Sequence, residues 1–147
     1  VFERSAQPFD HAFFERDGFI YDTEPPSRAI VALHNLAKDV SLAALKAVHR
    51  AFYAENRDVT DREVLADIAE ELGQDRDAFL TAFDLDDNRT ATQRGFDFSR
   101  SINVTGFPTL LAGDNDNGYR ALTQGYQSWE DIQPALDAYL AEPEIQV

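Results

Sequence analysis

The sequence predicts an α/β protein that is rich in helix and ends with a β-hairpin and a C-terminal helix. Apolar residues recur at helical spacing through residues 24–102, and capping residues bound several of these stretches. Two strand-like runs, residues 107–112 and 119–123, are separated by the turn sequence Asn-Asp-Asn-Gly. A further helical pattern follows Ser128. The 147 residues suffice for one domain with a single core.

The start of the chain is aromatic. Phe9, Phe13 and Phe14 lie near helical spacing, which predicts a short helix from Asp10 to Arg16. Residues 19–21 approach a pair of prolines, and this favours an extended segment because residues before proline avoid the helical region.

Two amphipathic helices are predicted next, over residues 24–37 and 41–56. Thr23 is a suitable N-cap for the first, which has two prolines in its first turn, where a missing N–H costs little. Its predicted buried side consists of Ile30, Val31, Leu33 and Leu36. The predicted apolar stripe of the second consists of Leu42, Leu45, Val48, His49 and Phe52.

Capping signals then define the remaining helices of this block. Thr60 is predicted to cap a helix in which Glu63 completes a capping box and Gly73 ends the last turn. Asp75 opens a short helix over residues 76–83. A last helix from Asp87 to Ser101 is predicted to bury Phe96, Phe98 and Ile102 at its end. We expect these helices to form a bundle joined by short loops.

The closing helix is expected to begin behind Ser128, with Asp131 at the capping-box position and a bend or late regular start at Pro134. A two-stranded hairpin is marginally stable alone, so it needs further strands. We therefore expect that an N-terminal segment of the fold is missing from this chain. Its start at Val1 and its lack of methionine indicate the same.

The composition excludes several functions. The net charge of −14, from 27 acids against 13 bases, repels phosphate backbones and anionic lipid, so neither nucleic acid nor a membrane is expected as a partner. No apolar run approaches membrane-spanning length. The chain has no cysteine, which removes disulfides, thiolate metal sites and thiol catalysis from these residues. This suits the bacterial cytoplasm and the periplasm equally.

One stretch is suggestive of a site. Gly106-Phe107-Pro108-Thr109 opens the first predicted strand, where a proline is tolerated. On the residues alone it is either a plain bend or a cis-proline loop beside a reactive site.

Other candidate sites are weaker. The acidic stretches 114–118 and 84–88 lack the glycine position of a calcium-binding EF-hand loop, and we interpret them as a hairpin turn and a helix boundary. The histidines have no metal-ligand spacing, and Trp129 is predicted to pack.

Several stretches together resemble the DsbA-family thiol-disulfide oxidoreductases, in the branch of predicted protein-disulfide isomerases. They are YDTEPPSRAIVA, AFYAENRDVTDREVLADIAEELG, VTGFPTLL and LTQGYQSWEDI, in the family's order and over nearly the whole chain. The resemblance implies a thioredoxin-like fold with an inserted helical domain. Residues 1–23 would be a connecting segment, 24–102 the helical insert and 103–147 the C-terminal ββα half, with the N-terminal βαβ part absent.

The resemblance also implies a site. Pro108 would be cis, and Gly106, Phe107, Pro108 and Thr109 would bind an extended substrate peptide or glutathione. The family's Cys-x-x-Cys would lie upstream of Val1, so no catalytic residue is carried over and the chain alone is expected to be inactive. The complete protein would exchange disulfides through a thiolate of lowered pKa.

Three functions therefore stay open. The first is a disulfide oxidoreductase or isomerase acting on protein or peptide thiols and disulfides. The second is a glutathione-dependent enzyme similar to kappa-class transferases and hydroxychromene-carboxylate isomerases. The third is a redox-dead thioredoxin-like module that binds peptides. Exposed hairpin edges also predict pairing with a second copy, as a homodimer.

Overall fold

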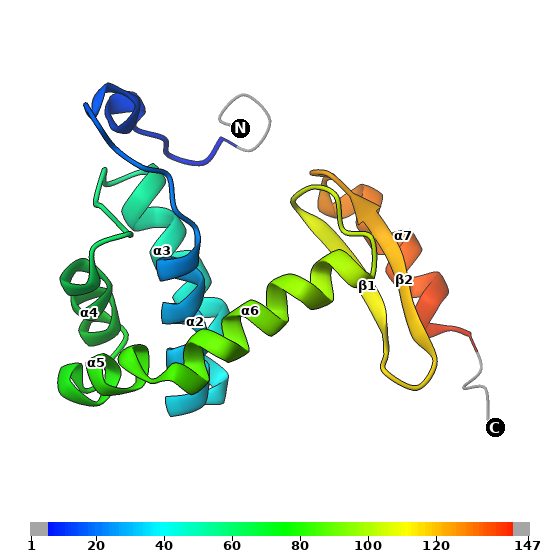
Figure 1. Cartoon of the computed structure of the whole chain (residues 1–147). Helices are drawn as coiled ribbons and strands as arrows, with labels where there is room; N and C mark the ends of the chain where they lie inside the picture. Colours follow the sequence, from blue (N-terminus) through cyan, green and yellow to red (C-terminus); the bar gives the residue numbers. More distant parts are fainter. Residues whose placement is uncertain (1–5, 143–147) are drawn as a thin grey trace. The chain divides into compact units, whose positions relative to one another are not determined.

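The computed structural model describes residues 6–142, and these divide into two compact units after Arg94 (Figure 1). The elements of the first unit are the 3₁₀ helices η1 (His11–Glu15) and η2 (Lys38–Val40) and the helices α2 (Glu24–Leu36), α3 (Ser41–Tyr53), α4 (Arg62–Glu71) and α5 (Arg76–Asp84). Helix α6 (Asp86–Ser101) contains the boundary, and the second unit continues with β1 (Thr109–Asp114), β2 (Gly118–Gln124) and α7 (Trp129–Leu140).

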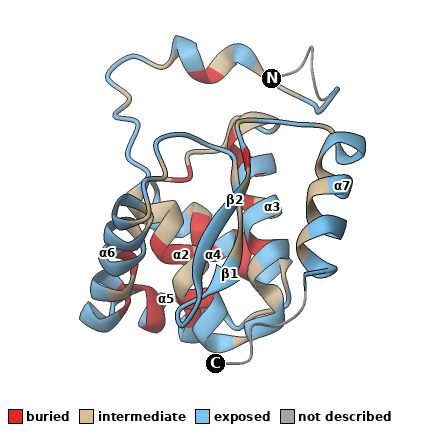
Figure 2. Ribbon diagram, turned by 90° about the vertical axis from the view of Figure 1, so that its right-hand side faces the viewer, coloured by how far each residue is buried: buried red, intermediate tan, exposed pale blue. Residues whose placement is uncertain are grey.

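The core of the first unit forms where α2 packs against α3, α4 and α5 (Figure 2). Its largest fully buried side chains come from three helices: Phe79, Leu33, Leu65 and Ile68. The predicted helical bundle is therefore confirmed. The predicted N-terminal helix forms as η1, in which Asp10 caps the N–H of Ala12. Residues 19–21 belong to no strand.

The predicted apolar faces of α2 and α3 are partly wrong. Leu42 is 82% exposed and Leu36 is 40% exposed, whereas Ala44 and Ala51 are buried. The buried face of α3 is thus turned toward its alanines. Small side chains at a helix contact let the two helix axes lie closer together.

The capping predictions succeed at three helix ends. Asp75 accepts a hydrogen bond from the Ala78 N–H, and Ser128 accepts one from the Asp131 N–H. Gly73 follows α4 with a φ of +77°, a conformation that glycine adopts without strain.

Two threonines predicted as caps do not cap. Asp61 is the N-cap of α4 and accepts from the Glu63 N–H, while Thr60 hydrogen-bonds Asp58. At α2, Thr23 holds the N-cap position, but the carboxylate of Asp22 accepts from the Glu24 N–H. At α4 the neighbouring carboxylate is the stronger acceptor and takes the bond. At α2 the second and third helical positions are Pro25 and Pro26, which have no N–H for the Thr23 hydroxyl to accept from.

The second unit contains an antiparallel hairpin with α7 packed against β2. The carboxylate of Asp114 accepts from the N–H groups of Asp116 and Asn117, and this closes the predicted turn. The first strand starts at Thr109, two residues later than Phe107. Pro134 lies inside α7. Phe98, predicted to be buried, is 42% exposed and packs edge-on against Tyr119, with ring centroids 5.4 Å apart.

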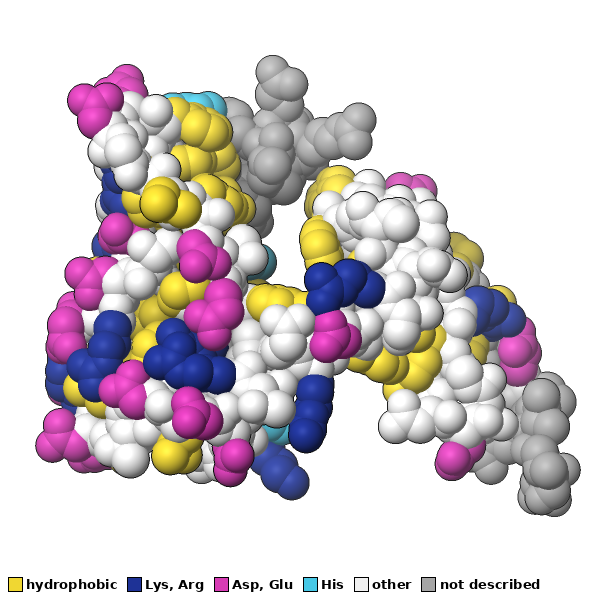
Figure 3. Space-filling model, in the orientation of Figure 1, with side chains coloured by type: hydrophobic (Ala, Val, Ile, Leu, Met, Phe, Trp, Pro, Cys, Tyr) yellow, Lys and Arg dark blue, Asp and Glu magenta, His cyan; other side chains and the backbone are white. Residues whose placement is uncertain are grey.

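Charged side chains of both signs alternate over the visible face of the helical unit (Figure 3). Arg76 at the start of α5 forms ion pairs of 2.6 to 2.8 Å with three carboxylates of α4: Glu63, Asp67 and Glu70. These contacts tie the two helices together. Within residues 6–142, no helix has both the length and the apolar character needed to cross a membrane.

Candidate functional site

The predicted substrate loop lies in the second unit, directly ahead of β1. The Phe107–Pro108 peptide bond is cis. The hydroxyl of Thr109 donates to the carbonyl of Gly106 at 2.7 Å, which closes the bend. The N–H of Gly125 donates to the carbonyl of Pro108 at 2.8 Å, which fixes the loop to the end of β2. The four predicted residues are therefore held together by the hairpin.

Phe107 carries the most exposed large hydrophobic side chain among the described residues. Its side chain is 84% exposed. Within the part of the chain that the structure describes, its backbone N–H and C=O make no hydrogen bond. Backbone polar groups normally find partners, so an ordered residue with both groups open can pair with an incoming extended chain.

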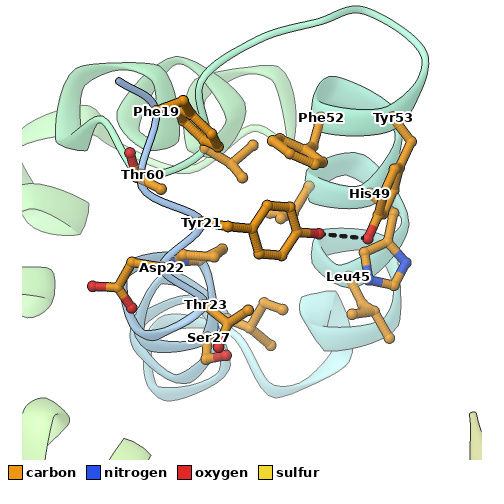
Figure 4. Close-up of a pocket in the computed structure, with 14 residues that line it drawn as sticks. Phe19, Tyr21, Asp22, Thr23, Ser27, Leu45, His49, Phe52, Tyr53 and Thr60 are labelled. Atoms are coloured by element: carbon orange, nitrogen blue, oxygen red, sulfur yellow. Dashed lines mark hydrogen bonds between the residues drawn. The ribbon is translucent and has the colours of Figure 1, made fainter. Parts of the chain in front are cut away.

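A second feature lies in the helical unit, where a pocket of about 150 Å³ opens between the segment ahead of α2 and helix α3 (Figure 4). Its walls are mainly aromatic and aliphatic. Phe19 and Tyr21 come from the segment, Ile30 from α2, and Phe52 and Tyr53 from α3. Tyr21 packs edge-on against Phe52, with ring centroids 5.2 Å apart.

Polar groups meet at one wall of this pocket. The hydroxyls of Tyr21 and Tyr53 are hydrogen-bonded at 2.7 Å (Figure 4). Burial, followed by this hydrogen bond, raises the pKa of Tyr21 to about 12, so its phenol stays protonated at neutral pH. Partial burial also lowers the pKa of His49, whose ring lies beside that of Tyr53. Ser27 and Thr23 also line the pocket.

The sequence did not predict this pocket. Tyr21 was predicted in an extended segment and His49 in the apolar stripe of a helix. Neither pattern indicates that Tyr21 lies at hydrogen-bond distance from Tyr53. The clustering of aromatic residues in both segments was the available signal.

The remaining candidate residues are dispersed. His34 hydrogen-bonds Ser41 at 2.7 Å, and His11 stacks on Phe14. Trp129, predicted to pack, is 58% exposed at the first position of α7. Helix α7 has no fully buried residue, and its half-buried positions Ile132, Ala135, Leu136 and Tyr139 come after Trp129.

The geometry can be compared with known proteins. The model of the DSBA-like thioredoxin domain family matches residues 11–137. A search of the curated proteins found no match. Among solved structures, the chain is similar to a protein from Nitrosomonas europaea that is provisionally assigned as a protein disulfide isomerase. The identity is 29% and the TM-score 0.90, over 95% of this chain and 68% of that one.

The chain is also similar to the cytosolic disulfide reductase DsbM from Pseudomonas aeruginosa, with 25% identity and a TM-score of 0.77 over 95% of this chain and 71% of that one. The structure of DsbM with GSH gives 25% identity and a TM-score of 0.75, over 96% of this chain and 72% of that one. The helix-rich fold with its hairpin agrees with these neighbours. The chain belongs to the DSBA-like thioredoxin domain family.

Proposed function

We propose that this chain serves thiol-disulfide exchange by holding the substrate chain at the loop of residues 106–109. The observation that carries the proposal is the open backbone of Phe107, which offers one donor and one acceptor ahead of β1. An extended peptide laid along the loop would satisfy both groups. Family membership supports the reaction class. In this proposal, residues 24–102 form the helical insert and residues 103–147 the ββα half of the thioredoxin-like fold.

The exchange itself needs a thiolate from outside these residues, because the chain contains no cysteine. That thiolate attacks one sulfur of the substrate disulfide, a new S–S bond forms, and the other substrate sulfur leaves with the electron pair as a thiolate. A second thiol then resolves the mixed disulfide. The contribution of this chain is orientation: Phe107 aligns the substrate backbone, and the bond from Thr109 to Gly106 keeps the loop in shape.

Glutathione is a second candidate substrate. The solved DsbM structure with GSH favours it, since that protein is similar to this chain over 96% of its length. Glutathione carries peptide-like amide groups, which can pair with the same open backbone of Phe107.

Peptide titration tests the proposal. Binding of an extended, disulfide-containing peptide to the full chain is followed by the backbone N–H signals of residues 104–107, 109 and 110, since Pro108 has no N–H. The control is the same peptide with a methyl group on the amide nitrogen that faces the loop, so that this nitrogen cannot donate a hydrogen bond. We expect the N-methylated peptide to bind about fivefold more weakly, which corresponds to one lost hydrogen bond. Equal affinities, or signals that move elsewhere and not in the loop, would contradict the proposal.

A pair of variants separates loop shape from general stability. Thr109→Val removes the hydroxyl that donates to Gly106, and we expect peptide affinity to fall severalfold. Thr105→Val makes the same chemical change at an exposed neighbouring position and should leave affinity unchanged.

A further inference from the structure

The pocket of the helical unit is lined by residues of that unit and has the features of a ligand site. Its volume of about 150 Å³ equals that of an apolar engineered cavity that takes up benzene. A single six-membered ring therefore fits. Leu45 and Ile30 offer aliphatic surface for the ring, and Phe19 and Phe52 offer aromatic surface.

Charge limits what can enter. Among the described residues that line the pocket, none is lysine or arginine, and Asp22 is the one that carries a formal charge. An anionic ligand would therefore find no compensating cation in the lining, and burying an unpaired charge is costly. The ligand should therefore be uncharged.

Hydrogen-bond capacity defines the polar end of the ligand. The hydroxyls of Tyr21 and Tyr53 hold two protons and share one hydrogen bond, so one proton is left to donate. Both oxygens also keep lone pairs. A ligand hydroxyl next to this pair can accept from one tyrosine and donate to the other.

We propose that this pocket binds an uncharged phenolic ring, with the ring between the aliphatic and aromatic walls and its hydroxyl at the Tyr21–Tyr53 pair. A free small phenol and the side chain of a tyrosine share this chemistry. The proposal goes beyond thiol-disulfide exchange: every residue that it uses belongs to the helical unit, whereas residues 106–109 belong to the second unit.

Three probes of similar size test the chemistry on the full chain: phenol, toluene and benzoate. Binding is followed by the NMR signals of the side chains of Ile30, Leu45 and Val48. We expect saturable binding of phenol in roughly the millimolar range, weaker binding of toluene, and none of benzoate over the same range. No saturable phenol binding, or benzoate binding as well as phenol, would overturn the proposal.

Two variants place the ligand in the pocket. Tyr21→Phe removes one hydroxyl and keeps the ring, so the preference for phenol over toluene should fall about fivefold, whereas Tyr126→Phe, the same change in the second unit, should leave it unchanged. Ile30→Phe puts a larger side chain in the lining of the pocket and should abolish binding of both rings. An unchanged preference in Tyr21→Phe, or unchanged phenol affinity in a folded Ile30→Phe protein, would refute the assignment.

A fourth probe distinguishes a tyrosine side chain from a free small phenol as the ligand. N-acetyltyrosinamide carries the phenol on a peptide backbone. Binding of both N-acetyltyrosinamide and phenol supports a tyrosine side chain as the ligand. Binding of phenol alone supports a free small phenol.

Discussion

Replacing Leu33 by alanine tests the helical core at its centre. Leu33 lies on α2 and is 0% exposed, packed where this helix meets its neighbours. The substitution removes three buried carbon groups, which costs about 2.4 kcal/mol at roughly 0.8 kcal/mol per group. The residual cavity adds to this cost, so we expect the free energy of unfolding to fall by about 3–4 kcal/mol.

The same substitution at Leu42 is the matched control. Leu42 lies on α3 and is 82% exposed, although the helical spacing of the sequence places it in the core. We expect Leu42→Ala to change the free energy of unfolding by less than about 0.5 kcal/mol. Urea titrations followed by far-UV circular dichroism measure both variants. Equal losses in the two, or a larger loss for Leu42→Ala, would refute this assignment of the buried faces.

Two further predictions concern charge and glycine. A hydrogen bond from Arg76 lowers the pKa of Glu63 below its ordinary value of 4.5. The stabilisation that this ion pair gives the folded state is therefore present above pH 4.5, and it is lost as the pH falls through the lowered pKa. Urea midpoints at about pH 7 and pH 3 should differ less in Arg76→Gln than in the parent, and an equal difference would contradict the ion-pair account. Gly113 has a φ of +144°, and a Cβ there would lie 2.0 Å from the carbonyl oxygen of Gly118. Gly113→Ala should therefore destabilise the hairpin by more than about 1 kcal/mol, whereas Gly95→Ala, in open space on α6, should be neutral or stabilising. Thermal unfolding of both variants decides this, and an unchanged melting temperature for Gly113→Ala would contradict the close approach of β1 to Gly118.

Local signals in the sequence predicted local structure well. Asp75 and Ser128 cap the helices that they were expected to cap, and Gly73 ends α4, because a cap depends on residues within one turn of each other. Where two neighbouring side chains can both accept a hydrogen bond from the first turn of a helix, the sequence does not predict which of them is the cap. Thr60 and Asp61 are such a pair, and the carboxylate is the cap.

Tertiary features could not be predicted in the same way. The helical spacing of α3 fits a stripe through Leu42 as well as one through Ala44, and the choice depends on how closely α2 approaches. The pocket needs residues 21 and 53 at hydrogen-bond distance, which no periodicity indicates. The loop at Pro108 was found from sequence because its residues are adjacent in the chain, and its proposed role came from the family resemblance.

The central claim is that the backbone of Phe107 receives the substrate chain, and hydrogen exchange at its amide tests this most directly. Phe107 N–H has no partner within the described residues and should exchange rapidly in the free chain. With a saturating disulfide-containing peptide, we predict that its exchange slows at least tenfold, while amides of the exposed turn at Asn115 keep their rates. Slowed exchange elsewhere with an unchanged rate at Phe107 would contradict the claim and locate peptide binding on another surface.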